Sequence, residues 1–171
     1  EAMRKVKIPR HRREQWGASE SRLSRPEIIE KLQRENLLPA ITFIFSRMGC
    51  DAAVKPCLAA GIKLTNTEER AEILKTAERY TANLPEEDLE VLGYREWITA
   101  LERGIAAHHA GLLPSFKNAI EDLFQRGLVK AVFATETLAL GINMPARTVV
   151  LDKLTKWNGE AHVPITPGEY T

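Results

Sequence analysis

Short apolar segments rich in β-branched and aromatic residues alternate along this chain with longer amphipathic segments. The short segments predict buried strands, and the longer ones predict helices. When helices separate successive strands, the strands form a largely parallel sheet with helices packed on both faces. We therefore expect an α/β domain whose buried strands lie within residues 40–46, 105–111, 129–135 and 147–152.

Residues that start or stop helices mark the boundaries of the longer segments. Asn66 and Glu69 have the spacing of a capping box, in which each side chain accepts a hydrogen bond from the other residue's backbone amide. Pro56 falls inside the segment 49–61, where we expect it to kink the helix or end it early. The predicted helices span residues 26–36, 49–61, 66–84, a short segment between Pro85 and Gly93, 94–104 and 114–127.

Polar residues follow three of the predicted strands at the point where each strand ends. The carboxyl ends of parallel strands share one edge of the sheet, and ligands bind at that edge. Several such corners in a row, each before a helix with free backbone N–H groups, favour a chain of phosphates. The alternative is that serine and threonine only cap the next helices. The corners are Ser46-Arg47, His108-His109-Ala110-Gly111 and Thr135-Glu136-Thr137.

The charge of the chain is nearly balanced overall but uneven along its length. The formal net charge is +1 over 171 residues, so any affinity for nucleic acid must come from a local patch. Residues 4–13 carry six Lys or Arg side chains and no acidic one, which is typical either of an arm that contacts phosphates or of a solvated linker. We expect residues 1–25 to be such an arm or linker, before a domain at 26–171.

The cysteines and the absence of long apolar runs indicate the compartment. Cys50 and Cys57 lie too far apart in one predicted helix for a local disulfide, so we expect buried thiols in a reducing environment. No apolar run approaches membrane-spanning length, and no charged-then-apolar leader opens the chain. These features predict a cytoplasmic protein that has no membrane partner.

The pair His108-His109 raises the question of a metal site. Adjacent residues on a strand point to opposite faces, so both rings cannot readily hold one ion. No third ligand with zinc-like spacing accompanies them. A loop histidine that donates a hydrogen bond is therefore the favoured interpretation, and no metal site is predicted.

Three segments together resemble helicase motifs. "PAITFIFSRMGCD" (39–51) resembles motif IV, and "AHHAGLLPSFKNAIEDLF" (107–124) and "VKAVFATETLALGINMPARTVVLDKL" (129–154) resemble motifs IVa and V, of superfamily 2 DExH-box helicases of the superkiller-like branch. Within that branch the segments look most like those of the bacterial HelY-type proteins. The resemblance implies the second RecA-like domain of a two-domain, ATP-driven motor, ending before motif VI.

The resemblance also implies roles for individual residues. Thr135 takes the position that contacts a nucleic-acid phosphate, with Glu136 beside it, and Gly141 and Asn143 take positions that face the nucleotide. Leu140 stands where the DEAD-box relatives have arginine, which favours the DExH branch. The further positions along the nucleic-acid path are Ser46, Arg47, His109, Gly111 and Lys117.

A hairpin is predicted after the last strand of the sheet. Asn158-Gly159 is a strong two-residue turn signal, and the hairpin is expected within residues 154–165, with Pro164 limiting it to a sheet edge. The resemblance implies that this is the strand-separating hairpin that related helicases carry between motifs V and VI. Trp157 beside Lys156 could stack on an opening base and hold its phosphate. The alternative is a surface hairpin whose tryptophan packs on its own domain.

Parts of a complete motor are not found in this sequence. It has no G-x-x-x-x-G-K-[ST] phosphate loop, and Glu86-Glu87-Asp88 begins a helix rather than following a buried strand. We therefore expect ATP and Mg²⁺ to be used by the full-length protein, neither to be bound by this fragment alone, and no catalytic residue to lie here. The expected partners are single-stranded RNA or DNA and a first RecA-like domain of the same chain, in a monomer.

Two other classes of function stay open at this point. One is a non-enzymatic α/β module that binds nucleic acid or protein. The other is a small-molecule enzyme, although neither histidine has an obvious nucleophile as a partner in the sequence.

Overall fold

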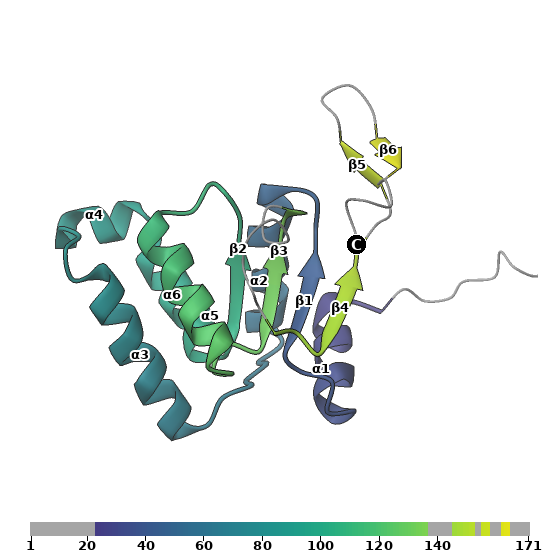
Figure 1. Ribbon diagram of the computed structural model, residues 1–171, viewed down its shortest axis with the longest axis horizontal. Helices are drawn as coiled ribbons and strands as arrows, with labels where there is room; N and C mark the ends of the chain where they lie inside the picture. The colour runs from purple at the N-terminus through teal and green to yellow at the C-terminus, as the bar shows by residue number, and fades with distance from the viewer. Residues whose placement is uncertain (1–22, 137–144, 153–154, 158–161, 165–171) are drawn as a thin grey trace, which may run out of the picture.

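The computed structural model describes residues 23–136, 145–152, 155–157 and 162–164. Its main sheet contains the parallel strands β1 (Ala40–Phe43), β2 (Ile105–His108), β3 (Ala131–Ala134) and β4 (Thr148–Leu151), in the order β2-β3-β1-β4. The pairing aligns the last residues of all four strands, so their carboxyl ends form one level edge. Figure 1 shows these strands side by side with their arrowheads at the same edge.

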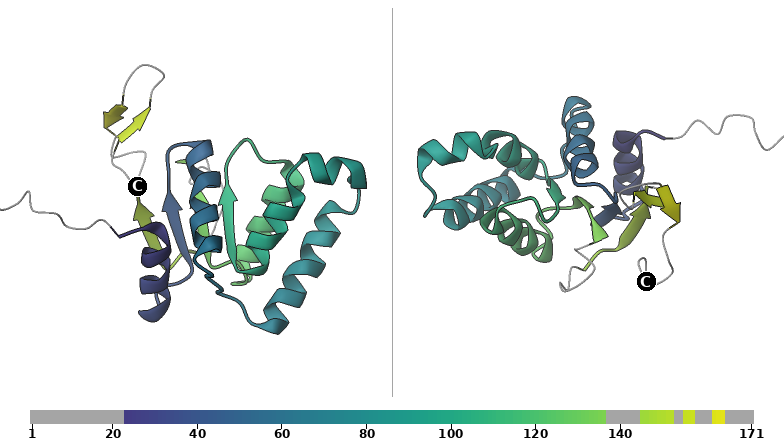
Figure 2. Two further views of the ribbon diagram at one scale, coloured as in Figure 1. Left: turned by 180° about the vertical axis from the view of Figure 1, so that it is seen from behind. Right: turned by 90° about the horizontal axis from the view of Figure 1, so that it is seen from above.

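Helices cover both faces of this sheet, as the alternation of segments predicts. On β3, Ala131 and Phe133 point into one apolar core and Val132 and Ala134 into the other. The first core includes α1 (Arg25–Arg34) and α2 (Arg47–Ala59). The second includes α3 (Thr67–Thr81), α5 (Tyr94–Glu102) and α6 (Pro114–Gln125), and α4 (Glu86–Val91) connects α3 to α5. Figure 2 shows α1 and α2 apart from the group of α3, α4, α5 and α6. The α/β fold class is thus confirmed and agrees with a RecA-like domain.

The capping box at the start of α3 is confirmed, whereas the early end that Pro56 was expected to cause in α2 is not observed. Asn66 Oδ1 accepts from the Glu69 amide at 2.8 Å, and Glu69 Oε2 accepts from the Asn66 amide at 2.9 Å. Helix α2 does not end early, because it continues through Pro56 to Ala59. The proline leaves the carbonyl of Ala52 without its helical donor, but Ala52 and Pro56 both lie on the exposed side of the helix, where water can replace it.

Strand β4 is not buried, contrary to the sequence-based prediction. Its residues are half-buried or exposed, and Val149 is 57% exposed. Val149 pairs with Ile41 and therefore lies on the face that α5 and α6 cover. Those helices pack over β2, and β4 is the outermost strand at the other end of the sheet. The sequence pattern indicates a strand here but does not reveal how far the helical layer extends.

A separate antiparallel pair, β5 (Thr155–Trp157) and β6 (His162–Pro164), follows β4 and lies beyond the carboxyl edge of the sheet (Figure 1). Trp157 pairs with His162. Both strands lie within the range 154–165 predicted for the hairpin, and the Asn158-Gly159 turn itself lies outside the described residues.

Both cysteines are buried free thiols. The Sγ atoms of Cys50 and Cys57 each donate to a backbone carbonyl, of Ile44 and Ala53 respectively, at 3.4 Å. Burial raises the pKa of Cys50 to about 12 and that of Cys57 to about 11, so neither is a reactive thiolate near neutral pH. Among the described residues, no helix has both the length and the apolarity that a membrane crossing requires.

Candidate nucleic-acid interface

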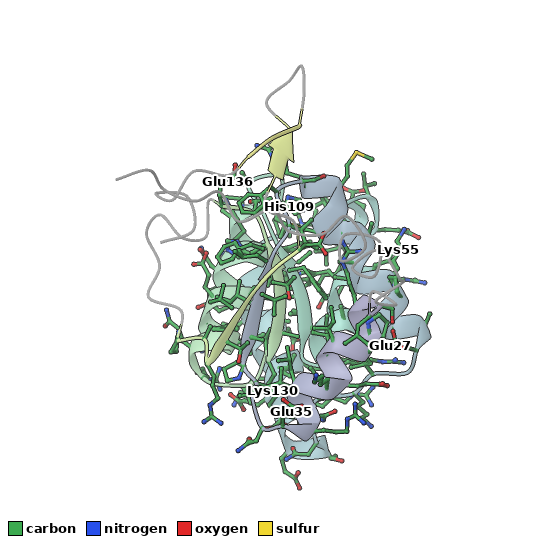
Figure 3. All side chains as sticks on the ribbon, turned by 90° about the vertical axis from the view of Figure 1, so that its right-hand side faces the viewer. Glu27, Glu35, Lys55, His109, Lys130 and Glu136 are labelled. Carbon is green, nitrogen blue, oxygen red and sulfur yellow. The ribbon has the colours of Figure 1, made fainter. Side chains whose placement is uncertain are left out.

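The three polar corners of the sequence meet at the carboxyl edge of the sheet. Ser46, His109 and Thr135 each follow directly, or within three residues, the last residue of β1, β2 and β3. Because β3 lies between β2 and β1, the Thr135 corner lies between the other two. Figure 3 shows His109 and Glu136 at the opposite end of the molecule from Lys130 and Glu35. The topology therefore turns three separate corners into one continuous edge.

The Ser46-Arg47 corner is both a helix cap and an exposed cationic site. Ser46 Oγ accepts a hydrogen bond from the Gly49 amide at 3.1 Å, so the capping role holds for this serine. Arg47 is exposed in the first turn of α2, and it makes no ion pair with any described residue. Its guanidinium is thus available to an anion beside the amino end of a helix.

The two histidines point to opposite sides of the sheet, as expected for neighbours on a strand. His108 Nε2 lies 2.8 Å from Glu121 Oε1 on α6, and His109 Nε2 lies 2.9 Å from Asp51 Oδ1 on α2. Both rings are buried, with 5% and 6% of the side chain exposed. Among the described residues, no group of three His, Cys, Asp or Glu side chains could hold a metal ion.

The turn after β2 is held by hydrogen bonds among its own residues. The Gly111 amide donates to His109 Nδ1 at 3.1 Å, and the Leu112 amide donates to the His109 carbonyl at 3.1 Å. A Cβ atom at Gly111 would lie 3.0 Å from His109 Nδ1, a tight contact, so the close approach of ring and backbone favours glycine. The tip of the turn, Ala110 and Gly111, remains exposed.

The remaining described positions differ in exposure. Thr135 is buried, with 6% exposed, and its amide lies 3.3 Å from the His108 carbonyl. Glu136 and Lys117 are half-buried, and Lys117 lies in the first turn of α6, near the same edge. Predicted positions outside the described residues are Thr137, Leu140, Gly141, Asn143, Asn158 and Gly159, whereas Lys156 and Trp157 lie on β5.

The charge along the edge is mixed. Arg25 at the start of α1 pairs with Asp152 after β4 at 3.2 Å, so each neutralises the other. Asp51 and Glu136 add negative charge, whereas Arg47 is an exposed cation on the same side. Such an edge does not attract polyanions through a broad positive field, so its affinity must come from a few placed contacts.

The partners of the two histidines, Asp51 and Glu121, were missed by sequence reasoning. Asp51 is four residues after Arg47 in α2, so the two side chains share one face of the helix. That spacing was the one local signal that Asp51 faces the same corner as Arg47. No comparable signal identified Glu121.

Comparison with known proteins gives several relatives that share most of this chain. No family model matches it. The chain is 64% identical over 149 residues to the probable helicase HelY of Mycobacterium leprae. These aligned residues make up 87% of this chain and 16% of that protein. It is 49% identical over 138 residues to the chloroplastic DExH-box ATP-dependent RNA helicase DExH15 of Arabidopsis thaliana, covering 81% of this chain and 11% of the relative.

A human relative aligns over nearly the whole chain. Superkiller complex protein 2 of Homo sapiens is 38% identical over 165 residues, covering 96% of this chain and 13% of that protein. The chain thus spans about one sixth or less of the length of these relatives.

Proposed function

Because this chain belongs to the superkiller-like branch of the DExH-box helicases, as a segment of such a protein, we propose that it is the second RecA-like domain of an ATP-dependent helicase. The observation that carries the proposal is the level carboxyl edge on which the three polar corners meet. The edge presents an exposed arginine at a helix start, a compact glycine turn and a threonine corner, which suits a track for consecutive phosphates.

The nucleic acid that we propose for this edge is single-stranded RNA or DNA, and the proposed contacts come from Ser46, Arg47, Gly111, Lys117, Thr135 and Glu136. The name of the plant relative, an RNA helicase, supports RNA as the first choice. We propose a monomer that works in the cytoplasm, with a first RecA-like domain elsewhere in the same chain. The antiparallel pair β5 and β6, which lies beyond the same edge, is proposed to separate the strands through Trp157.

The residues described here do not form a complete nucleotide site. Among them, no group of three His, Cys, Asp or Glu side chains could hold a metal ion. Gly141 and Asn143, which we propose face the nucleotide, lie outside the described residues. We infer that ATP and Mg²⁺ are held mainly by other parts of the protein, and that this domain contributes one wall of the site.

The proposal is tested with Arg47→Ala in the full-length protein. Binding of single-stranded RNA and of single-stranded DNA is measured by fluorescence anisotropy over a series of salt concentrations. Loss of one phosphate contact should weaken binding and lower the slope of log K against log salt by about 0.7, the value for one phosphate of a single strand. The matched control is Lys75→Ala, which removes an exposed cation from the middle of α3.

Two results would contradict the proposal. If Arg47→Ala binds single strands no more weakly than Lys75→Ala does, the carboxyl edge is not the nucleic-acid interface. If the full-length protein does not unwind a duplex in the presence of ATP and Mg²⁺, the proposed motor activity is wrong.

A further inference from the structure

His109 is held by two hydrogen bonds that fix which of its ring nitrogens carries the proton. Nδ1 accepts from the Gly111 amide at 3.1 Å, so Nδ1 carries no proton in this arrangement. The neutral ring then has its proton on Nε2, which donates to Asp51 Oδ1 at 2.9 Å. The ring therefore connects the turn after β2 to helix α2, and it has no nitrogen left for a ligand.

Arg47 and Asp51 lie on the face of α2 that meets this turn. They are four residues apart, one helical turn, so their side chains are neighbours. A methyl group placed on Gly111 would lie 3.7 Å from Cδ of Arg47, which shows that the stem of the arginine lies beside the glycine. Asp51 thus anchors the 109–111 turn through His109. The Gly111 end of that turn lies against the side chain of Arg47.

From this geometry we infer that Asp51 and His109 are positioning residues, which set the place of the Arg47 guanidinium relative to the 109–111 turn and so the spacing of two neighbouring phosphate contacts. Neither residue touches the nucleic acid in this role. The inference rests on the proposed function, because it needs Arg47 to contact a phosphate. It changes the role that the resemblance implies for His109, from a contact along the nucleic-acid path to a support behind it.

A charge effect and a positioning effect predict opposite changes in nucleic-acid binding when Asp51 is replaced. Asp51 is therefore the residue to mutate. Asp51 is negative and 56% exposed, so its removal should strengthen the binding of a polyanion if charge alone mattered. If Asp51 instead positions Arg47, its removal should weaken that binding. The exposure of Asp51 also means that its variants should fold, whereas His109 is buried and a variant there could fail for structural reasons.

The experiment compares Asp51→Ala and Asp51→Asn in the full-length protein by anisotropy with single-stranded RNA. Both variants lose the charge, but asparagine keeps an oxygen that can accept from His109 Nε2. Asp51→Ala should weaken binding about fivefold, equivalent to about 1 kcal/mol and thus to one hydrogen bond. Asp51→Asn should recover most of that loss. Glu30→Ala on α1 removes an exposed carboxylate outside the three polar corners, so it is the matched control and should bind as the unmodified protein does.

A double-mutant cycle with Arg47→Ala completes the test. If Asp51 acts through Arg47, Asp51→Ala should cost less than twofold once Arg47 is alanine. The inference is overturned if Asp51→Ala binds as well as or better than the unmodified protein, if Asp51→Asn loses as much as Asp51→Ala, or if the two losses add. These results differ from a failure of the proposed function, in which Arg47→Ala alone has no effect.

Discussion

Replacing Gly49 with alanine would test how tightly the corner after β1 is packed. Gly49 lies in the first turn of α2, and its amide donates to Ser46 Oγ. A Cβ atom on Gly49 would lie 2.8 Å from Cγ2 of Ile44 and 3.3 Å from Cβ of Ser46. The first distance is too short for two carbon atoms. Because Ile44 is buried, with 6% exposed, the corner itself must shift.

Two effects of opposite sign decide the size of the change. Alanine is favoured over glycine inside a helix by about 1 kcal/mol. Overpacking of a well-packed site costs about 1–3 kcal/mol. We expect the overpacking to exceed the helix preference, so Gly49→Ala should lower the free energy of unfolding by about 1 kcal/mol net. The shift should also displace Ser46 and Arg47, and thereby weaken binding to single strands.

The measurement is urea unfolding of the 171-residue chain, followed by circular dichroism, for Gly49→Ala, Ile44→Ala and the double variant. Ile44→Ala removes the Cγ2 atom that causes the collision. In that background only the milder contact with Ser46 opposes the helix preference, so Gly49→Ala should become stabilising by up to about 1 kcal/mol. An equal loss of stability in both backgrounds, or no loss in the unmodified chain, would refute the reasoning.

Three further predictions concern the motor and the helix caps. This chain alone should release no phosphate from ATP, with or without single-stranded RNA or DNA; turnover above a heat-inactivated sample would reveal an active site within it. In the full-length protein, Trp157→Ala should reduce duplex unwinding more than ATP hydrolysis, whereas equal losses would make Trp157 a structural anchor. Burial raises the pKa of Glu69, but hydrogen bonds from the Asn66 amide and from Lys130 outweigh it and lower the pKa overall. The stability that Glu69 contributes should thus be complete above its unfolded pKa of about 4.3, and it should disappear as the pH falls through the lower, folded value. Glu69→Gln should therefore flatten the acidic part of the curve of unfolding free energy against pH. An unchanged curve would contradict this role of Glu69.

The sequence predicts those features that a few neighbouring residues decide. The capping box needs only Asn66 and Glu69, and it forms as expected. The class of fold follows from the alternation of apolar and amphipathic segments, because each segment must bury one side of itself. The meeting of the three corners follows as well, since parallel strands share one carboxyl edge.

Other features depend on residues far apart and have no local signal. Asp51 meets His109 across 58 positions of the sequence, and only the packing of α2 against β2 brings them together. The exposure of Val149 depends on where the helical layer ends, which the pattern of β4 itself does not record.

The strand order has a consequence for synthesis on the ribosome. Strand β1 is made first, but its two neighbours in the sheet are β3 and β4, the last to be made of these four. About 90 residues separate β1 from β3, so at about 5–20 residues per second β1 waits roughly 4–18 s for its first neighbour. During that time the hydrogen-bonding groups on both sides of β1 lack their native strand partners, and the nascent chain is most prone to mispairing there. A pause in translation before residue 131 should therefore lower the yield of folded protein more than an equal pause after residue 151.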